Sequence, residues 1–507
     1  MKNKFLIISI LISFYSYSQN PLISEDSFKQ KEWVDRVYNN LSLDERIGQL
    51  YTVWVATRYG EEEIEHISKL IRDYHLGGLI FSLGNIKDQA IAINKFQKLS
   101  KVPLLISMDA EWGIGMRLRD AFSFPYNMTL GAIQDDKLIY EVGKRIGYHA
   151  KRLGVQINFA PVVDINTNPR NPIIGFRSFG EDKFNVASKA LNYLKGMHYY
   201  GIMGAAKHFP GHGDTETDSH VTLHSINFST ERINEVELYP FKELINNNLD
   251  GIMTAHLNIP NLDKTKISTL SKKVINNLLI EDLNFKGLVI TDALDMKAIV
   301  DFSKGEHQDV AALNAGNDLL LMPTDIEKSI KEIKKALKKG KIKPKRLEDA
   351  VKKNLMAKFN SGLDNFKPIK LENIVEDLNQ DEDFALLDRL AEESITLVKN
   401  SNSNLPLTIS NDKPIGYINF GDDTFDTFLS YMNKYDDVYH INSFNNDNLS
   451  QKAKDYKKII IGLHKSDKSP FGEYKFTPDE ISIINDLKNS NDITLVVFSK
   501  PYSMLDI

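Results

Sequence analysis

A single stretch of the chain, KHFPGHGDTETDSH at residues 207–220, gathers many groups that can move protons or bind ions. It holds three histidines, one lysine and three acidic residues, interrupted by a proline and two glycines. Residues of these types could form a metal site, could stabilise turns, or could carry out acid and base chemistry. The spacing within the stretch separates these three interpretations.

The histidines of this stretch do not have the arrangement of a helical zinc site. His208 and His212 are four residues apart, as two zinc ligands on a helix would be, but Pro210 and Gly211 lie between them. Proline and glycine disfavour a helix interior, so the helical zinc motif does not apply. A metal site on a loop, using His212, Asp214 or His220, is the alternative that we keep open. The prediction is that the protein uses no metal and no other cofactor.

Asp218 and His220 have a spacing that suits proton transfer. Residues two apart on an extended or turned loop can point the same way, so the Asp218 carboxylate can accept a hydrogen bond from the His220 imidazole. Such a bond orients the ring and stabilises its charged form. Histidine titrates near neutral pH, which suits a group that gives up a proton and then takes one back. We therefore interpret Asp218 and His220 as an acid/base pair.

The elements that would position these residues are predicted by eight apolar, β-rich runs separated by stretches of helical periodicity. Several runs lack polar alternation, as strands buried on both faces do in parallel sheets. Eight strand–helix units predict an α/β fold, a (β/α)8 TIM barrel. A doubly wound open sheet is the alternative, but no G-x-G-x-x-G follows the first run. The runs are 48–55, 77–84, 103–111, 154–165, 201–209, 251–257, 287–294 and 317–323.

Polar residues recur at the ends of these runs, where a barrel forms its active site. Carboxylates, cations and imidazoles that converge there would suit a polar substrate with many hydroxyl groups. Each residue also has a structural interpretation: Asp295 as a helix cap, Asp164 as a residue that orders its loop, and Arg177 as an ion-pair partner. The residues are Asp109, Glu111, Arg117, Asp164, Arg177, Lys207, His208, His256, Asp292 and Asp295.

The chain is long enough for more than one domain. We predict the barrel at 27–366 and an acidic, asparagine-containing linker at 367–386. A second, smaller α/β sandwich-like domain follows at 387–507, with strand-like runs SITLVKN, KPIGYINFG, KKIIIGLHK and DITLVVFSKP. The sequence stops soon after the last run, which predicts either a small domain or one that continues beyond residue 507.

The N-terminus predicts export from the cytoplasm. Lys2 and Lys4 precede an apolar run that starts at Phe5, and Ser16 and Ser18 form a small-residue cleavage pattern. This is the layout of a signal peptide, placed at 1–18, and the apolar run is too short to span a membrane in the mature chain. We expect a periplasmic or secreted protein. The chain has no cysteine, and its formal net charge of -5 argues against nucleic acid as a partner.

Four segments of the chain resemble glycoside hydrolase family 3, and within it the bacterial β-N-acetylglucosaminidases. The resemblance covers roughly residues 27–360, the whole predicted barrel, and KHFPGHGDTxxDSH is its most specific part. It implies a carbohydrate substrate that contains N-acetylglucosamine (GlcNAc). The segments are NFAPVVDINTNPRNPIIGFRSFGED, KHFPGHGDTETDSH, GLVITDALDM and ALNAGNDLLLMP.

The resemblance implies a role for individual residues. Asp292 would be the nucleophile of a retaining, exo-acting enzyme, and His220 with Asp218 would be the acid/base pair in place of the usual second carboxylate. Five further residues match positions that bind the sugar. The segment EWGIGMR departs from the family, where EGGRVxR is common, and keeps Asp109 and Arg117 in register. The five are Asp109, Arg117, Arg177, Lys207 and His208.

Other functions stay open at this point. A β-glucosidase or β-xylosidase of the same family is the first alternative. The second alternative is phosphorolytic transfer of GlcNAc. An imidazole in place of an acidic residue would put no anion at the acid/base position, so phosphate could enter. A glycan-binding module without catalysis is the third. The oligomeric state and the leaving group of the substrate do not follow from the sequence.

Overall fold

The protein is described here from a computed structural model that covers residues 20–215, 224–296, 299, 306–400, 404–407, 414–442, 449–456, 458–466 and 472–507. The predicted signal peptide at 1–18, and Asp218 and His220, lie outside these residues. The chain divides into two compact units. The first runs to Ile174 and continues over Ser178–Ser394, and the second comprises Gly175–Arg177 and Ile395–Ile507.

The first unit contains an eight-stranded parallel sheet in the order β10-β1-β2-β3-β4-β5-β7-β9. A parallel bridge from Ile290 to Leu319 joins the last strand to the first, and the Thr291 amide donates to the Leu319 carbonyl at 3.0 Å. The sheet therefore closes into the predicted (β/α)8 barrel. Its strands are β1 (Tyr51–Val55), β2 (Gly78–Phe81), β3 (Leu105–Met108), β4 (Ile157–Asn158), β5 (Met203–Phe209), β7 (Gly251–Thr254), β9 (Leu288–Thr291) and β10 (Leu320–Leu321).

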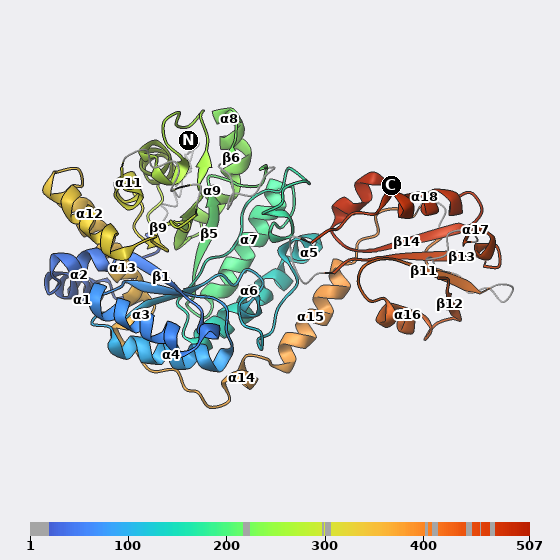
Figure 1. Cartoon of the computed structure of the whole chain (residues 1–507), viewed down its shortest axis with the longest axis horizontal. Coiled ribbons are helices and arrows are strands. Elements are labelled where there is room, and N and C mark those ends of the chain that lie inside the picture. The colour runs from blue at the N-terminus through green and yellow to red at the C-terminus, as the bar shows by residue number, and fades with distance from the viewer. Residues whose placement is uncertain are drawn as a thin grey trace, which may run out of the picture. The chain divides into compact units, whose positions relative to one another are not determined.

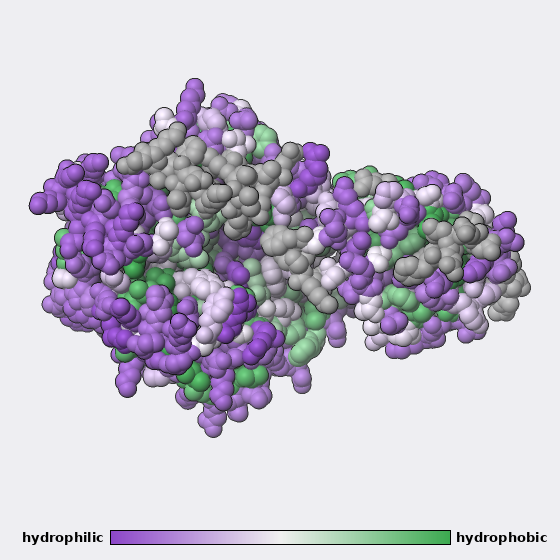
Figure 2. Space-filling view, viewed as in Figure 1, coloured by the Kyte–Doolittle hydropathy of each residue, from purple (hydrophilic) through white to green (hydrophobic). Residues whose placement is uncertain are grey.

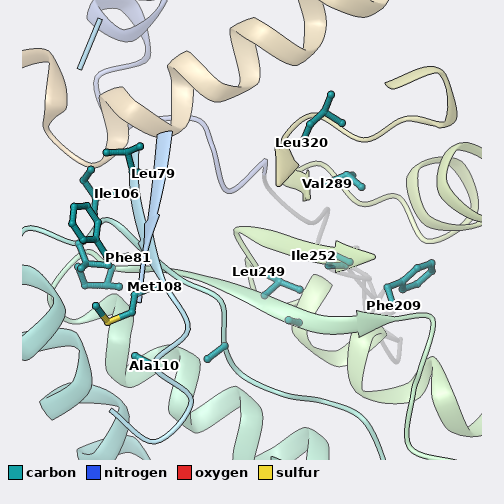
Figure 3. Close-up of a cluster of buried hydrophobic side chains, with 14 of the residues drawn as sticks. Leu79, Phe81, Ile106, Met108, Ala110, Phe209, Leu249, Ile252, Val289 and Leu320 are labelled. Atoms are coloured by element: carbon teal, nitrogen blue, oxygen red, sulfur yellow. The ribbon is translucent and has the colours of Figure 1, made fainter. Parts of the chain in front are cut away.

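Both faces of the barrel strands are buried, which explains why their sequences lack polar alternation. Leu79 and Phe81 of β2 belong to the core under the helices, and Figure 3 shows them beside Ile106 and Met108 of β3. Ile80, the residue between them, belongs to a separate cluster with inner side chains of other strands. This alternation with a period of two separates the barrel interior from the outer core.

Helices surround the strands of the first unit (Figure 1), and hydrophilic residues predominate on the face of this unit in Figure 2. Helix α12, for example, buries Ile326, Ile330 and Ile333 on one side. The helices are α1 (Ser27–Asn39), α2 (Leu43–Gly48), η1 (Thr57–Tyr59), α3 (Glu61–Tyr74), α4 (Ile86–Leu99), η2 (Ile114–Met116), α5 (Asn127–Ala132), α6 (Asp136–Leu153), α7 (Lys183–His198), α8 (Thr230–Arg232), η4 (Ile233–Glu237), α9 (Tyr239–Ile245), η5 (Ser268–Leu270), η6 (Lys273–Asp282), α11 (Gln308–Ala315), α12 (Ile326–Lys338), α13 (Pro344–Asn360) and η7 (Leu363–Asn365). The first unit also has a short parallel pair, β6 (His224–Ser225) and β8 (Leu257–Asn258).

The segment predicted as a linker forms two further helices of the first unit, α14 (Ile374–Asp377) and α15 (Asp381–Ser394). Its acidic residues pair with basic residues of α6: Asp377 with Arg152 at 2.8 Å, and Asp383 with Arg145 at 2.8 Å. Burial would raise the pKa of Asp383, but His149 and Arg145 outweigh it and lower this pKa to about 2. The acidic composition of this segment thus serves packing on the barrel, and the second unit begins at Ile395.

The second unit contains a four-stranded parallel sheet in the order β12-β11-β13-β14, which confirms a smaller α/β domain after the barrel. The prediction of a strand in SITLVKN is wrong, because the described residues 395–400 form no strand, and Ile395 is 82% exposed. The elements are β11 (Ile415–Gly421), α16 (Asp426–Met432), β12 (Val438–His440), α17 (Leu449–Ala453), β13 (Lys458–His464), α18 (Pro478–Leu487), β14 (Asp492–Phe498) and η9 (Pro501–Asp506), with η3 (Gly175–Arg177). Within the described ranges, no helix is long and apolar enough to cross a membrane.

Candidate active site

Several of the polar residues selected from the sequence lie at the carboxyl ends of the barrel strands. Parallel strands all end at the same rim of a barrel, so side chains from distant parts of the chain meet there. Asp109 follows β3, Lys207 and His208 lie in the last part of β5, and Asp292 follows β9. The rim therefore brings these groups together because of the strand order, not because of local sequence.

Asp109, Lys207 and Arg117 form a charged cluster. Lys207 Nζ lies 2.7 Å from Asp109 Oδ1, and the Arg117 guanidinium donates to Asp109 Oδ2, also at 2.7 Å. Burial would raise the pKa of Asp109, but Lys207 and Arg117 outweigh it, so this pKa is lowered and the carboxylate stays charged at neutral pH. Charged groups fixed in this way make strong, directional hydrogen bonds to hydroxyl groups.

Glu111 belongs to the same cluster and was not assigned a role from the sequence. Its carboxylate lies 2.8 Å from Lys207 Nζ, and both side chains are almost completely buried. Lys207 is thus held between two carboxylates that are two residues apart in the chain. The signal in the sequence was the position of Glu111 at the end of the third run, two residues after Asp109.

His208 is oriented by a buried carboxylate. Its Nδ1 donates to Asp164 Oδ2 at 2.6 Å, and the backbone amides of His208 and His212 donate to the other side of the same carboxylate at 3.2 and 2.7 Å. Burial would raise the pKa of Asp164, but His208 and His212 outweigh it and lower this pKa. Asp164 therefore both orders its loop and fixes the ring of His208.

The described part of the histidine-bearing loop, residues 211–215, is packed against the barrel. A Cβ atom on Gly213 would lie 1.8 Å from the Ile165 carbonyl oxygen, and Gly211 has a φ of +131°. His212 Nδ1 lies 2.8 Å from the Thr215 hydroxyl. Close packing and backbone conformation thus account for both glycines. The continuation with Asp218 and His220 is outside the described residues, so their roles stay predictions.

Asp292 has the surroundings of an ionised carboxylate. Its amide donates to the Thr254 carbonyl at 3.1 Å, and the Ala293 amide donates to Asp292 Oδ1 at 2.8 Å. Burial would raise the pKa of Asp292, but His256, His208 and Lys207 are near and the pKa is lowered. A charged carboxylate at the end of a barrel strand can act as a nucleophile toward an electrophilic carbon.

The roles of Arg177 and Asp295 stay predictions. Arg177 ends η3, which groups with the second unit, so its role in sugar binding stays a prediction. Asp295 is exposed, three residues after Asp292. Among the described residues there is no group of three acidic or histidine side chains that could hold a metal ion.

The barrel rim thus contains an ionised carboxylate, a charged cluster and an oriented imidazole. These groups can bind a hydroxyl-rich molecule and attack one of its carbons without any redox chemistry. Comparison with known proteins agrees with this. The profile described as "Glycosyl hydrolase family 3 N terminal domain" matches residues 42–356.

Curated relatives include a beta-hexosaminidase A of Pseudoalteromonas piscicida, 38% identical over 285 residues. That match covers 51% of this chain and 48% of the relative, so the chain spans about half of that relative's length. A protein of Cellulomonas fimi named beta-N-acetylglucosaminidase/beta-glucosidase is 28% identical over 386 residues, which is 74% of this chain and 68% of that protein.

Two solved structures have the same fold. A glycoside hydrolase family 3 beta-N-acetylglucosaminidase from Paenibacillus sp. str. FPU-7 has a TM-score of 0.75 and 30% identity, over 92% of this chain and 91% of that one. A beta-glucoside phosphorylase has a TM-score of 0.82 at 22% identity, over 96% and 90% of the two chains, which is a likeness in fold alone. Because the family profile covers more than half of the 507 residues, the chain belongs to glycosyl hydrolase family 3.

Proposed function

We propose that this protein is an exo-acting, retaining β-N-acetylglucosaminidase that hydrolyses terminal, non-reducing GlcNAc. The observation that carries the proposal is Asp292, an ionised carboxylate on the barrel rim whose pKa is lowered despite burial by His256, His208 and Lys207. Relatives named beta-hexosaminidase, at 38% and 33% identity, support GlcNAc as the sugar.

The reaction would proceed by two displacements at the anomeric carbon. A carboxylate oxygen of Asp292 attacks this carbon while the glycosidic bond breaks, and the His220 imidazolium gives its proton to the departing oxygen. The neutral imidazole then takes a proton from water, the water oxygen attacks the same carbon, and the bond to Asp292 breaks. Two inversions give net retention, with Asp218 as the partner of His220.

The charged cluster would bind the hydroxyl groups of the sugar. Lys207 donates two of its three N–H groups to Asp109 and Glu111, which leaves one for a ligand. Arg117 and Asp109 can contact neighbouring hydroxyls from one side. Arg177 and His208 are predicted to contribute further bonds. Exact positioning of the ring beside Asp292 would then follow from the rigid barrel strands.

The deciding experiment compares nitrophenyl β-GlcNAc with nitrophenyl β-glucoside and β-xyloside under the same conditions. The proposal expects the highest kcat/KM for GlcNAc by at least about tenfold, because a site built for one substituent rejects analogues that lack it. A preference for the glucoside would instead support the β-glucosidase alternative. Turnover of none of the three, with measurable affinity for GlcNAc, would support a binding module.

Two further comparisons test the remaining alternatives. Added phosphate would produce GlcNAc 1-phosphate if an anionic acceptor enters beside a neutral His220, and only free GlcNAc if the reaction is hydrolysis. A chelator should leave the rate unchanged, because no step of the proposed mechanism uses a metal. Loss of activity on chelation, restored by a divalent ion, would favour the loop-borne metal site.

We propose that the protein acts outside the cytoplasm. Its substrates there would be peptidoglycan fragments or other exported glycans. The predicted signal peptide at residues 1–18 supports export, and a periplasmic or secreted location fits it equally. Fractionation of cells that produce the full-length chain, together with N-terminal sequencing of the mature protein, tests this. A cytoplasmic protein with an intact Met1 would contradict it.

A further inference from the structure

His256 links the end of β7 to the segment that carries the proposed nucleophile. The residue lies just after β7 and is 2% exposed. Its Nε2 lies 2.9 Å from the Ala293 carbonyl oxygen, and its Nδ1 lies 2.8 Å from the Thr269 hydroxyl. A carbonyl oxygen can only accept a hydrogen bond, so Nε2 carries a proton and donates it to Ala293.

The ring is held from both sides. Thr269 itself is fully buried, and its hydroxyl lies 2.6 Å from the carbonyl oxygen of Ala255. Ala255 is the residue before His256 in the chain. The imidazole therefore has a fixed orientation, with one nitrogen tied to η5 and the other to the residue after Asp292. A buried ring with both nitrogens engaged loses little further freedom when a substrate binds.

Ala293 connects this imidazole to the carboxylate. The Ala293 carbonyl accepts from His256, and the Ala293 amide donates to Asp292 Oδ1 at 2.8 Å. The same segment is also fixed by the bond from the Asp292 amide to the Thr254 carbonyl of β7. The Ala293 amide thus binds one oxygen of the carboxylate, Oδ1, and does not bind the other, Oδ2.

We propose that His256 is a positioning residue for the nucleophile: it holds Ala293 so that the Ala293 amide fixes Oδ1 of Asp292 and leaves Oδ2 to attack the anomeric carbon. This inference rests on the proposed function. It assigns His256 no contact with the sugar and no proton transfer. Its main effect is on position, with a second, electrostatic effect on the Asp292 carboxylate. A displacement of about 1 Å at a reacting atom can cost on the order of a hundredfold in rate.

The electrostatic surroundings point the same way. Burial is the largest influence on the pKa of Asp292 and would raise it, and His256 comes first among the neighbours that lower it. Burial also lowers the pKa of His256, so this ring carries a positive charge only at acid pH, where the carboxylate titrates. His208 and Lys207 from β5 also lower the pKa of Asp292, and Asp295 lies near enough to act on His256. Loss of His256 should therefore raise the pKa of Asp292, and with it the pH of the acid limb of kcat/KM.

The test compares His256→Phe with His256→Gln, whose side-chain amide can still donate to Ala293 from the position of Nε2. With nitrophenyl β-GlcNAc, we expect His256→Phe to lower kcat by about a hundredfold and leave KM within about threefold. His256→Gln should keep kcat within about fivefold of the wild type. Both variants should shift the acid limb to higher pH. Thr269→Val removes the hydroxyl that contacts Nδ1 and keeps the imidazole ring, and it should lower kcat by about tenfold. This variant replaces His256→Phe in the test if the Phe variant does not fold.

Several outcomes would overturn the inference. A His256→Phe enzyme with nearly wild-type kcat would do so. A second such outcome is an equal loss of kcat in the Phe and Gln variants, accompanied by an equal loss of GlcNAc affinity and of thermal stability. An unchanged acid limb in both variants would also contradict it. If the wild type turns over none of the three nitrophenyl glycosides, the proposed function itself fails and this inference falls with it.

Discussion

The Nδ1 atom of His208 lies 2.6 Å from the Oδ2 atom of Asp164, and this contact joins the loop after β4 to the end of β5. Both residues are buried at the barrel rim. The same carboxylate accepts the backbone amides of His208 and His212, so it fixes the start of the histidine-bearing loop as well as the ring.

Asp164→Asn should disturb both functions of this carboxylate. The amide cannot accept from all three N–H groups, because one of its ends is a donor. We expect kcat/KM for nitrophenyl β-GlcNAc to fall by about tenfold to a hundredfold, mainly through KM if His208 binds the sugar. A kcat/KM equal to that of the wild type would show that the orientation of His208 does not matter for turnover.

Glu111→Gln should weaken substrate binding. Lys207 would lose one of its two anionic partners, while the amide oxygen could still accept a hydrogen bond. We expect KM to rise by about tenfold and kcat to change less, because the ammonium group is displaced from its position. Glu65→Gln on α3, which removes an exposed ion pair with Arg72, is the matched control and should leave KM unchanged.

Asp292→Ala should abolish turnover, because no other group would form the covalent bond to the anomeric carbon. We expect a loss in kcat of at least about four orders of magnitude. A small anion such as azide, added to this variant, should restore some cleavage by occupying the space of the carboxylate. Residual activity above about a tenth of the wild type would identify another nucleophile.

His220→Ala tests the proton donor, which lies outside the described residues. Loss of a general acid matters most for a poor leaving group, because such a group needs its proton in the transition state. We expect a strong loss for alkyl or sugar leaving groups and a much smaller one for dinitrophenyl GlcNAc. Equal losses for good and poor leaving groups would count against His220 as the acid.

The ion pairs of Asp383 predict how stability depends on pH. The pKa of this carboxyl is about 2 in the folded protein, below its value of 3.8 without these contacts. The ionised form therefore contributes stability above about pH 4, and this contribution is lost as the pH falls through about 2.

Asp383→Asn should accordingly lower the free energy of unfolding at pH 7 by about 2 kcal/mol. The difference from the wild type should shrink toward pH 2. Urea unfolding at several pH values measures it, with Asp381→Asn, an exposed position on the same helix, as the control. A difference that stays constant with pH would show that the loss arises from packing.

Much of this molecule was predictable because the signals are local. The eight strands lie within the eight apolar runs, since a strand buried on both faces must be apolar at successive positions. The same runs predicted which polar residues follow each strand. Even here local pattern was not sufficient throughout: SITLVKN has the composition of a strand, but residues 395–400 form none in the described structure, since composition gives only a propensity and tertiary context decides.

The sequence by itself determined the order of strands and helices, the family, and the candidates Asp109, Lys207, His208 and Asp292. Only the tertiary structure decided that Glu111 and Asp109 share Lys207, that Asp164 fixes His208, and that His256 holds the residue after Asp292. The packing at Gly213 was likewise decided by the approach of another segment, at Ile165. These contacts join residues far apart in the chain, and the closure of the barrel, rather than any local pattern, brings them within hydrogen-bonding distance.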